Sequence, residues 1–476
     1  MRYIIPLLII IISYYYYYQQ QQQTMNKLPV IIIGTGLSGL STSFKLLEQK
    51  IPVVLVDKLT KFGGNSIKAS SGINGIQTNT QLQQGVQDSF EEFLNDTVKS
   101  SGFKGDLDLQ KKLVSGSNRA INWLQKDIGV GLDLVNRLGG HSHERTHRST
   151  GIPPGFEIIS KLKSKILEYE DQGLELMMGW KLIDIKIEKG QIQGVFLQNE
   201  QREIKYIKTN HLIMATGGFS YSQELLSKYR PDLINFPTTN GEQTLGEGQI
   251  LLEKIGAQLI DMDKIQIHPT GFINPSDPEN RWKFLAAESL RGIGGVLLNI
   301  DQLERFIDEL TTRDKVTEGI LKQKDQKAYL VLNEDMYLDF KFQLDFYIKQ
   351  GLVKKGTLKE LFNEDSTKVH NVLINYSQNE IDPLGRSFKA HSFNNITVDT
   401  EIYLATITPV VHFTMGGVKI NSEGQVLDTQ GQLIQGLFAV GEISGGVHGE
   451  NRLGGNSLLE CVVFGLGVGE FIGGRY

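Results

Sequence analysis

The sequence predicts an α/β fold, in which a buried parallel sheet is flanked by helices. The first observation is a continuous apolar run, Val30 to Ile33, which is typical of a strand buried on both faces. The second is the order that follows: a glycine-rich turn, a helical pattern from Leu40 to Gln49 and a second apolar run, Val53 to Asp57. The third is the 51 glycines in 476 residues, about 11% against about 7% in average proteins, which indicates many close backbone approaches.

The composition excludes several classes of protein. With 40% hydrophobic residues and a net charge of −5, the chain is not an extended disordered protein, a collagen or a coiled coil. Its length favours two domains, or one large domain with an insertion. No Lys/Arg-rich tract is present, so nucleic acid is not an expected partner. The single cysteine, Cys461, excludes an intrachain disulfide and cysteine-ligated metal clusters, so any redox chemistry requires an organic cofactor.

Residues 1–25 form a block of separate composition, with a short apolar run followed by five tyrosines and five glutamines. Arg2 before the apolar run resembles a signal peptide, but an Ala-x-Ala cleavage site is missing and the run is shorter than the ~20 residues that span a bilayer. Three interpretations stay open: a targeting segment or weak anchor, a disordered tail, or an extension upstream of a true start at Met25. Membrane contact is expected only through residues 3–18. A targeting role implies an endomembrane or organelle lumen; otherwise the cytoplasm is expected.

The glycine-rich turn carries a dinucleotide-binding fingerprint. Gly34 allows a tight turn, Gly36 lets the backbone approach a pyrophosphate, and Gly39 lets the helix pack closely on the strand. Free N–H groups at the start of the helix would bind the phosphates. Asp57 lies 18 residues after Gly39, where a carboxylate can accept both hydroxyls of an adenosine ribose. The sequence therefore predicts a Rossmann-like site rather than an ordinary glycine-rich turn, formed by Gly34, Gly36, Leu37, Ser38, Gly39, Asp57 and Lys58.

Further segments of small residues follow in a recognisable order. They are Gly63 to Gly72, Ala215 to Gly218, Gly246 to Gly248, Gly441-Glu442 and Asn456 to Leu458. This ordered set resembles the FAD contacts of the fumarate reductase/succinate dehydrogenase flavoprotein family, above all its soluble eukaryotic branch, from about Pro29 to the C-terminus. The resemblance implies further FAD contacts from Gly64, Asn65, Ser66, Ser70, Ser71, Gly72, Ala215, Thr216, Gly217, Glu247, Glu442, Ser457 and Leu458.

The same resemblance implies that FAD is bound non-covalently. Membrane-bound relatives attach the flavin to a histidine in the loop that corresponds to Gly63 to Gly72, and this loop contains no histidine. A non-covalent flavin is normally less oxidising, so reduction of the substrate is favoured over its oxidation.

Five other segments resemble the dicarboxylate site of the family. A dicarboxylate in a site that excludes water requires cationic or strongly donating groups at both ends. The resemblance implies that His412 and Arg452 bind one carboxylate of fumarate or succinate, and that His268 helps to bind the other. Reduced FAD would then deliver a hydride from N5 to one alkene carbon.

The remaining two segments imply a proton pathway. Arg313 matches the proton donor of the family, and Glu288 and Arg291 match the relay that reprotonates it. Because the pKa of an arginine is normally above 12, rapid reprotonation through a neighbouring carboxylate is required. Glu288 and Arg291 are three residues apart and would share a helix face. A structural ion pair is the alternative for each. Ala287 stands where bacterial relatives carry threonine, so a hydroxyl donor is absent.

Other histidines are not assigned to catalysis. His448 lies close to Arg452 in the sequence and is either near the flavin or structural. Three histidines and a glutamate suggest a metal cluster: His141, His143, His147 and Glu144. Arg145 and Arg148 stand among them and would repel a cation, so no metal is expected. This loop is expected to approach the cofactor instead.

The order of the segments implies a discontinuous FAD-binding domain, residues 26–261 and 412–476, around an inserted α+β capping domain, residues 262–411. Within the cap, helices are expected from Thr317 to Lys322 and from Asp335 to Ile348. Such a cap can close over a substrate and exclude water.

The favoured function is therefore FAD-dependent reduction of fumarate to succinate. Reduced flavins or an unidentified protein would supply the electrons, because no haem-attachment motif and no convincing second dinucleotide motif are present. One alternative keeps the fold but changes the substrate, as in L-aspartate oxidase or reductases of other unsaturated acids such as urocanate. Another is a non-catalytic flavin-binding module, although such a module would not need Arg313 as a proton donor.

Overall fold

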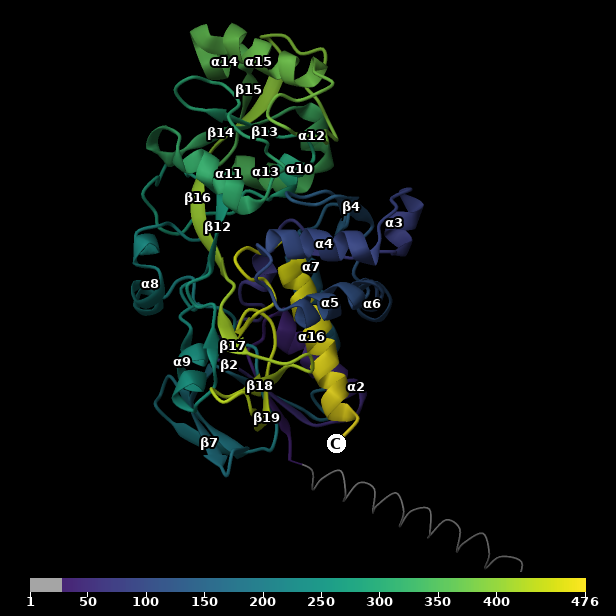
Figure 1. The fold of residues 1–476 in the computed structure, drawn as a ribbon, viewed down its shortest axis with the longest axis vertical. Helices are drawn as coiled ribbons and strands as arrows, with labels where there is room; N and C mark the ends of the chain where they lie inside the picture. Colours follow the sequence, from purple (N-terminus) through teal and green to yellow (C-terminus); the bar gives the residue numbers. More distant parts are fainter. Residues whose placement is uncertain (1–27) are drawn as a thin grey trace, which may run out of the picture.

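The computed structural model describes residues 28–476, so the segment proposed for targeting, residues 1–25, lies outside the described residues. Two bodies lie one above the other along the long axis of the molecule (Figure 1). The larger contains the predicted nucleotide-binding strands, and the smaller contains the predicted cap. The expected α/β architecture is confirmed.

A nine-stranded sheet forms the centre of the larger body. β1 (Val30–Ile33) pairs in parallel with β2 (Val53–Asp57) on one side and β10 (Leu212–Met214) on the other, and Ile32 lies opposite Leu55 and Ile213. β19 (Leu433–Ala439), from the C-terminal part of the chain, continues the sheet beside β10. The strand order is β6 (Leu174–Met178), β2 (Val53–Asp57), β1 (Val30–Ile33), β10 (Leu212–Met214), β19 (Leu433–Ala439), β8 (Gln191–Asn199) and β7 (Trp180–Glu188), with β18 (Gln425–Leu427) on β19 and β9 (Ile204–Lys208) on β8.

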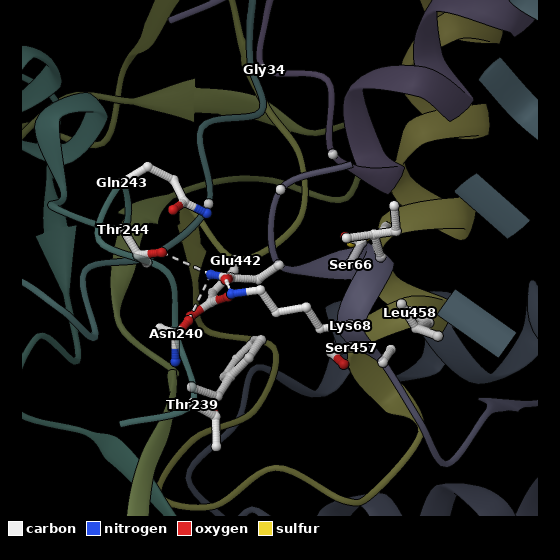
Figure 2. Close-up of a pocket in the computed structure, with 18 of the residues that line it drawn as sticks. Gly34, Ser66, Lys68, Thr239, Asn240, Gln243, Thr244, Glu442, Ser457 and Leu458 are labelled. Carbon is white, nitrogen blue, oxygen red and sulfur yellow. Dashed lines mark hydrogen bonds between the residues drawn. The ribbon is translucent and has the colours of Figure 1, made fainter. Parts of the chain in front are cut away.

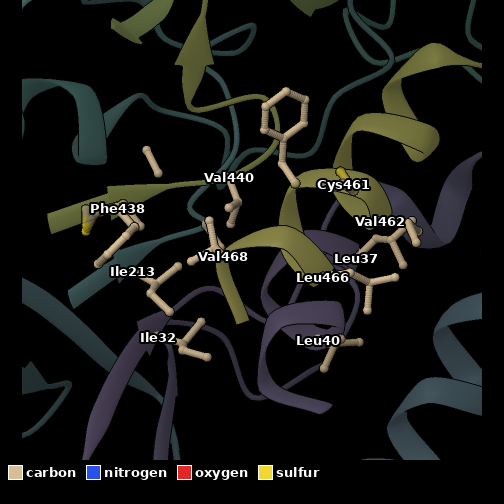
Figure 3. Packing of buried hydrophobic residues seen from close by; sticks show 14 of the residues in the cluster. Ile32, Leu37, Leu40, Ile213, Phe438, Val440, Cys461, Val462, Leu466 and Val468 are labelled. Carbon is tan, nitrogen blue, oxygen red and sulfur yellow. The ribbon is translucent and has the colours of Figure 1, made fainter. Parts of the chain in front are cut away.

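Two helices from opposite ends of the chain pack side by side on this sheet. They are α2 (Leu37–Glu48) and α16 (Asn456–Gly473) (Figure 1). Leu37 and Leu40 of α2 and Val462 of α16 belong to one buried apolar cluster with the strands (Figure 3). α16 has the length and apolarity of a membrane-spanning helix, with a mean hydropathy of 1.3, but 67% of it is buried inside the fold.

Shorter elements complete the larger body. A three-stranded antiparallel sheet consists of β3 (Ile73–Asn74), β5 (Thr146–Arg148) and β4 (Leu134–Asn136). The other helices of this body are α3 (Asn79–Gln83), α4 (Phe90–Ser100), α5 (Leu107–Ser115), α6 (Ser117–Trp123) and α7 (Pro154–Leu167).

The cap contains a five-stranded antiparallel sheet and its own apolar core. The strand order is β12 (Ile265–Phe272), β16 (Glu401–Thr414), β14 (Ala328–Leu332) and β13 (Val296–Asn299), with β15 (Lys354–Thr357) also on β16. Its helices are α10 (Ser289–Gly292), α11 (Arg313–Leu321), α12 (Glu334–Asp339), α13 (Lys341–Lys349), α14 (Leu358–Phe362) and α15 (Ser366–Gln378). The cap core is separate from the core around the large sheet.

The expected cap helices differ from those observed. The helix expected from Thr317 begins earlier, at Arg313. The single helix expected from Asp335 to Ile348 is two helices, because Phe340, with φ −120° and ψ 23°, leaves helical geometry. Phe340 is buried in the cap core and Arg148 lies 3.9 Å over its ring, so tertiary contacts at this residue replace a helical turn.

The chain crosses between the two bodies through the paired strands β12 and β16. α8 (Gln223–Tyr229) and α9 (Glu247–Lys254) precede the first crossing. A small sheet of β11 (Leu259–Ile260), β17 (Gly417–Lys419) and β20 (Ser444–Gly445) flanks both crossings. Residues that are far apart in the sequence are thereby brought together at the boundary between the bodies.

Candidate active site

A cavity of about 830 Å³ extends from the β1–α2 turn to the boundary with the cap. All predicted cofactor residues line it except Leu37 and Gly39. Figure 2 shows residues from the N-terminal part, including Ser66 and Lys68, facing Glu442 and Ser457 from the C-terminal part. The two separated segments of the predicted nucleotide-binding domain thus form one cavity.

The β1–α2 turn has the local structure that the glycine pattern predicts. Gly34 has φ +116°, and a Cβ on Gly39 would lie 1.9 Å from the Gly34 carbonyl oxygen. Gly39 is therefore required for helix packing and does not face the cavity, which explains its absence from the lining. A Cβ on Gly36 would have 3.7 Å to its nearest neighbour, Ser66 Oγ, so the need for glycine there comes from a ligand.

Asp57 faces the cavity and also supports the turn. Its Oδ2 accepts hydrogen bonds from the Thr35 N–H at 2.8 Å and from the Thr35 hydroxyl at 2.6 Å. The predicted ribose acceptor thus sits beside the start of α2, where the N-cap residue Gly36 offers no side-chain cap and only the Leu37 N–H donates to a side chain, Ser66 Oγ at 3.3 Å. Free N–H groups at this end suit a pyrophosphate.

The polar lining fits an elongated dinucleotide. The buried hydroxyls of Ser70 and Thr216 line the cavity and have no hydrogen-bond partner within the described residues. Buried polar groups without partners are costly, so these hydroxyls require a ligand or water in the cavity. Asn65 is held by hydrogen bonds to Asn240 Oδ1 at 2.7 Å and Thr244 Oγ1 at 2.8 Å. The residues present therefore fit FAD.

At the inner end of the cavity, His412 of strand β16 stands with Arg452, which lies in the loop before α16. His412 Nδ1 lies 2.7 Å from the Thr239 hydroxyl. The Arg452 guanidinium lies 4.4 Å over the ring of Phe413, and its Nε makes no hydrogen bond to the described residues. Burial, with a contribution from Arg313, lowers the pKa of Arg452 to about 9, so this side chain is still cationic at neutral pH.

His268 lies beside His412, with 5.1 Å between the ring centroids. The backbone N–H of Thr270 donates to His268 Nδ1 at 3.2 Å, so the proton of the neutral ring lies on Nε2. Nε2 has no partner among the described residues. Burial, and then Arg313, holds the pKa of both histidines well below the usual value, so both rings are neutral. His268 does not itself line the cavity; it stands directly behind His412.

The predicted proton pathway is a continuous set of buried contacts. Arg313 lines the cavity, and its Nε donates to Glu288 Oε2 at 2.8 Å. The other carboxylate oxygen of Glu288 lies 3.5 Å from Arg291 Nη2. Burial alone would raise the pKa of Glu288, but attraction to Arg313 and Arg291 outweighs it and lowers this pKa to about 2. Glu288 and Arg291 do not line the cavity, so only Arg313 can reach a ligand.

Sequence reasoning missed Gln266. Its Oε1 accepts from Arg313 Nη1 at 2.9 Å, and its Nε2 donates to the Arg452 carbonyl at 2.7 Å. Its position two residues before His268 could have indicated that it belongs to the site, because alternate residues of a strand share a face. Thr239, which contacts His412, carried no such signal.

The other histidines play different parts. His448 donates to or accepts from Glu460 at 3.0 Å and packs against Phe413, away from the cavity lining, so the structural alternative is favoured. No residue between 141 and 148 lines the cavity, so the expected approach of this loop to the cofactor is wrong. His141, for example, is buried and its Nε2 bonds the Gly454 carbonyl instead. Among residues 28–476, the only group of side chains close enough together to ligate a metal ion is Asp88, Glu92 and His143. Both carboxylate oxygens of Asp88 already accept hydrogen bonds from Arg145.

The fold and this site define a class: a dinucleotide-binding α/β protein with an anion-binding end beside the cofactor. The FAD binding domain family matches residues 29–458. Fumarate reductase 1 of Saccharomyces cerevisiae is 48% identical over 465 residues, covering 94% of this chain and 99% of the relative. Fumarate reductase of Schizosaccharomyces pombe is 39% identical, covering 94% of this chain and 90% of the relative.

A solved structure is also similar. The open conformation of a flavocytochrome c3 fumarate reductase has a TM-score of 0.73 and 30% identity, and covers 96% of this chain and 81% of that chain. The chain therefore belongs to the FAD-binding fumarate reductase family, and the resemblance seen in the sequence is confirmed.

Proposed function

We propose that this chain is an FAD-dependent fumarate reductase, which reduces fumarate to succinate. The observation that carries the proposal is the charge at the inner end of the cavity. Glu288 lies between Arg291 and Arg313, and its single negative charge can neutralise only one of these two arginines. Arg452 has no acidic partner within 4 Å in the described part of the chain. Buried unpaired cations are costly, so the site requires an anion. Fumarate carries two negative charges.

The side chains have distinct parts in this reaction. His412 and Arg452, which line the cavity, bind one carboxylate. His268 does not line the cavity, so its part in holding the other carboxylate and polarising the double bond requires its free Nε2–H to reach the substrate from behind His412. When bound, reduced FAD supplies a hydride for one alkene carbon. Arg313 donates a proton to the neighbouring carbon, and its proton is replaced through Glu288 and Arg291. The direct bond from Arg313 to Glu288 supports this order.

The proposed electron donors are reduced flavins or an unidentified protein. Aromatic side chains stand at the mouth of the cavity, and Phe156 and Phe342 are more than half exposed, at 53% and 58%. Phe346 and Trp282 belong to the same lining, and the rings of both pack against Phe284. Aromatic faces suit a planar isoalloxazine, which supports a flavin donor.

An anaerobic experiment tests the function. The purified protein should be yellow and should release FAD, not FMN, on mild acid denaturation. After chemical reduction, fumarate should reoxidise the flavin, whereas urocanate and oxaloacetate should not. Reoxidation by another unsaturated acid in preference to fumarate would favour the alternative substrate class. Bound FAD that no acid reoxidises would favour the non-catalytic module.

A further inference from the structure

Behind the proton pathway, the cap contains a buried ion cluster of Arg305, Glu309, Asp382 and Arg386, none of which lines the cavity. Glu309 lies between the two arginines: Arg305 Nη2 is 2.7 Å and Arg386 Nη1 is 3.2 Å from Glu309 Oε2. Both Glu309 and Arg386 have fully buried side chains. A cluster this deeply buried is weak evidence for stability, because the cost of dehydrating the charges offsets their attraction. Its contacts with Arg291 suggest another role.

Arg386 holds the backbone of Arg291. Its Nη2 donates to the Arg291 carbonyl at 2.6 Å, and its Nη1 donates to the Gly295 carbonyl at 2.9 Å. The Arg291 carbonyl lies at the end of the short helix α10 and also accepts from the Gly294 N–H at 3.2 Å, and the Gly295 carbonyl follows the helix. Arg386 therefore fixes the end of the helix that carries Arg291.

Arg386 also holds the side chain of Arg291 indirectly, through Glu309. The Glu309 carbonyl accepts from Arg291 Nη1 at 2.6 Å, and the Glu309 carboxylate is bonded by Arg386, Arg305 and the Leu297 N–H. Arg291 Nε and Nη2 make no hydrogen bond within the described residues. The position of the guanidinium relative to Glu288 thus depends on one carbonyl, and that carbonyl depends on this cluster.

We propose that Arg386 is a positioning residue for the proton relay: it holds Arg291 at both its backbone and its side chain, so that Arg291 stays within reach of Glu288. This inference rests on the proposed function. Residue 386 lies 95 positions from residue 291, so only the fold reveals the contact.

The test compares Arg386→Met with Arg305→Met. Each variant removes one guanidinium from Glu309, but only Arg386 contacts Arg291. Arg305→Met also leaves Asp382 without its partner, so it should destabilise the protein at least as much. Arg386→Met should lower kcat for fumarate by about 10- to 100-fold, because a displacement near 1 Å at a reacting group can cost on the order of 10²-fold.

Four further results separate positioning from instability. The fumarate dissociation constant, taken from flavin spectral shifts, should change by less than about threefold in Arg386→Met, because the binding residues are untouched. The kcat ratio between H₂O and D₂O should rise above that of wild type, because proton delivery becomes limiting. Arg305→Met should lower kcat by at least about threefold less than Arg386→Met does, because it loosens Glu309 but leaves the Arg291 backbone held by Arg386. Arg386→Lys, which keeps the charge and some donors, should recover part of the activity.

Equal losses of kcat in the two methionine variants, following their melting temperatures, would overturn the inference. So would an unchanged isotope ratio in Arg386→Met. If Arg386→Met does not fold, the same comparison is made between Arg386→Lys and Arg305→Lys. A wild-type protein that fails to reduce fumarate would overturn the proposed function itself, whereas normal wild-type turnover with a fully active Arg386 variant would overturn only the positioning role.

Discussion

Arg313 and Arg452 both face the inner end of the cavity, but their partners differ. Arg313 donates to Glu288 and Gln266, whereas Arg452 lies over Phe413 with no acidic partner within 4 Å in residues 28–476. An arginine bonded to a carboxylate can recover a proton that it has donated. A buried arginine without an acid is suited to bind an anion. The two side chains should therefore fail in different ways when they are removed.

Arg313→Ala should abolish fumarate reduction while fumarate still binds. Positioned proton transfer contributes typically about 10²–10⁴-fold to a rate, and the alkene requires a proton as well as a hydride. Arg452→Ala should lose affinity as well as turnover, because it removes a carboxylate contact. The measurements are turnover with a reduced dye and the fumarate dissociation constant. Turnover by Arg313→Ala within about tenfold of wild type would move the proton donor elsewhere in the cap.

At the scale of elements, one glycine of the β1–α2 turn is required by the fold and another by the cofactor. A Cβ on Gly39 would collide with the Gly34 carbonyl, whereas Gly36, with φ −68° and ψ 177°, adopts a conformation open to any residue. Gly39 therefore serves helix packing, and Gly36 serves the approach of the pyrophosphate.

Gly39→Ala should destabilise the apoprotein by roughly 1–3 kcal/mol or more, because backbone atoms must move. Gly36→Ala should leave the apoprotein as stable as wild type, or more stable by up to about 1 kcal/mol, because alanine restricts the unfolded chain. It should nevertheless weaken FAD binding. The measurements are urea unfolding of the apoprotein and FAD affinity from flavin fluorescence. A similar loss of stability in both variants would contradict this division.

At the scale of the whole molecule, Glu442 joins the two bodies. Its Oε1 accepts from the Thr414 N–H at 3.0 Å, where β16 returns from the cap. Burial raises the pKa of Glu442 to about 7, although the hydrogen bonds from Thr414 oppose the shift. The folded pKa thus lies above the ordinary value of 4.5, and the carboxyl is held in its protonated form at mildly acidic pH.

The stability of the apoprotein should therefore contain a pH-dependent contribution from Glu442. Because the folded pKa is raised, this contribution is fully present below about pH 4.5 and is lost as pH rises through about 7. Between pH 5 and 8 the loss should be about 2–3 kcal/mol. Glu442→Gln, which keeps the acceptor but cannot ionise, should lack this loss. Other titrating groups are common to both proteins, so the comparison of their urea unfolding at the two pH values isolates Glu442.

A wild-type protein and a Glu442→Gln variant with the same change in unfolding free energy from pH 5 to 8 would show that the carboxyl titrates normally. The control is Glu460→Gln. Glu460 is a second buried glutamate, which lies on α16 and bonds His448 rather than the cap strand. Because the Glu460 charge is the smallest of the contributions to the raised pKa of Glu442, this variant should leave most of the pH dependence that Glu442 causes.

The sequence by itself determined the nucleotide-binding unit and the types of residue at the reactive end. Strand, turn and helix are contiguous there, so apolar periodicity and glycine spacing contain the relevant physics. β2 ends at Asp57 as expected, and Gly34 has the positive φ that its position requires. The ordered resemblance added Arg313, His412 and Arg452, which the fold brings to one end of one cavity.

Only the tertiary structure decided how these residues act on one another. It placed Gln266 between Arg313 and Arg452, broke the cap helix at Phe340, and brought Arg386 to Arg291. Each of these outcomes depends on burial or on contacts between segments that are distant in the chain. A single sequence shows which groups are present and the periodicity of neighbouring residues. The distances between groups that are far apart in the sequence, and the removal of water from around them, are set only when the chain folds.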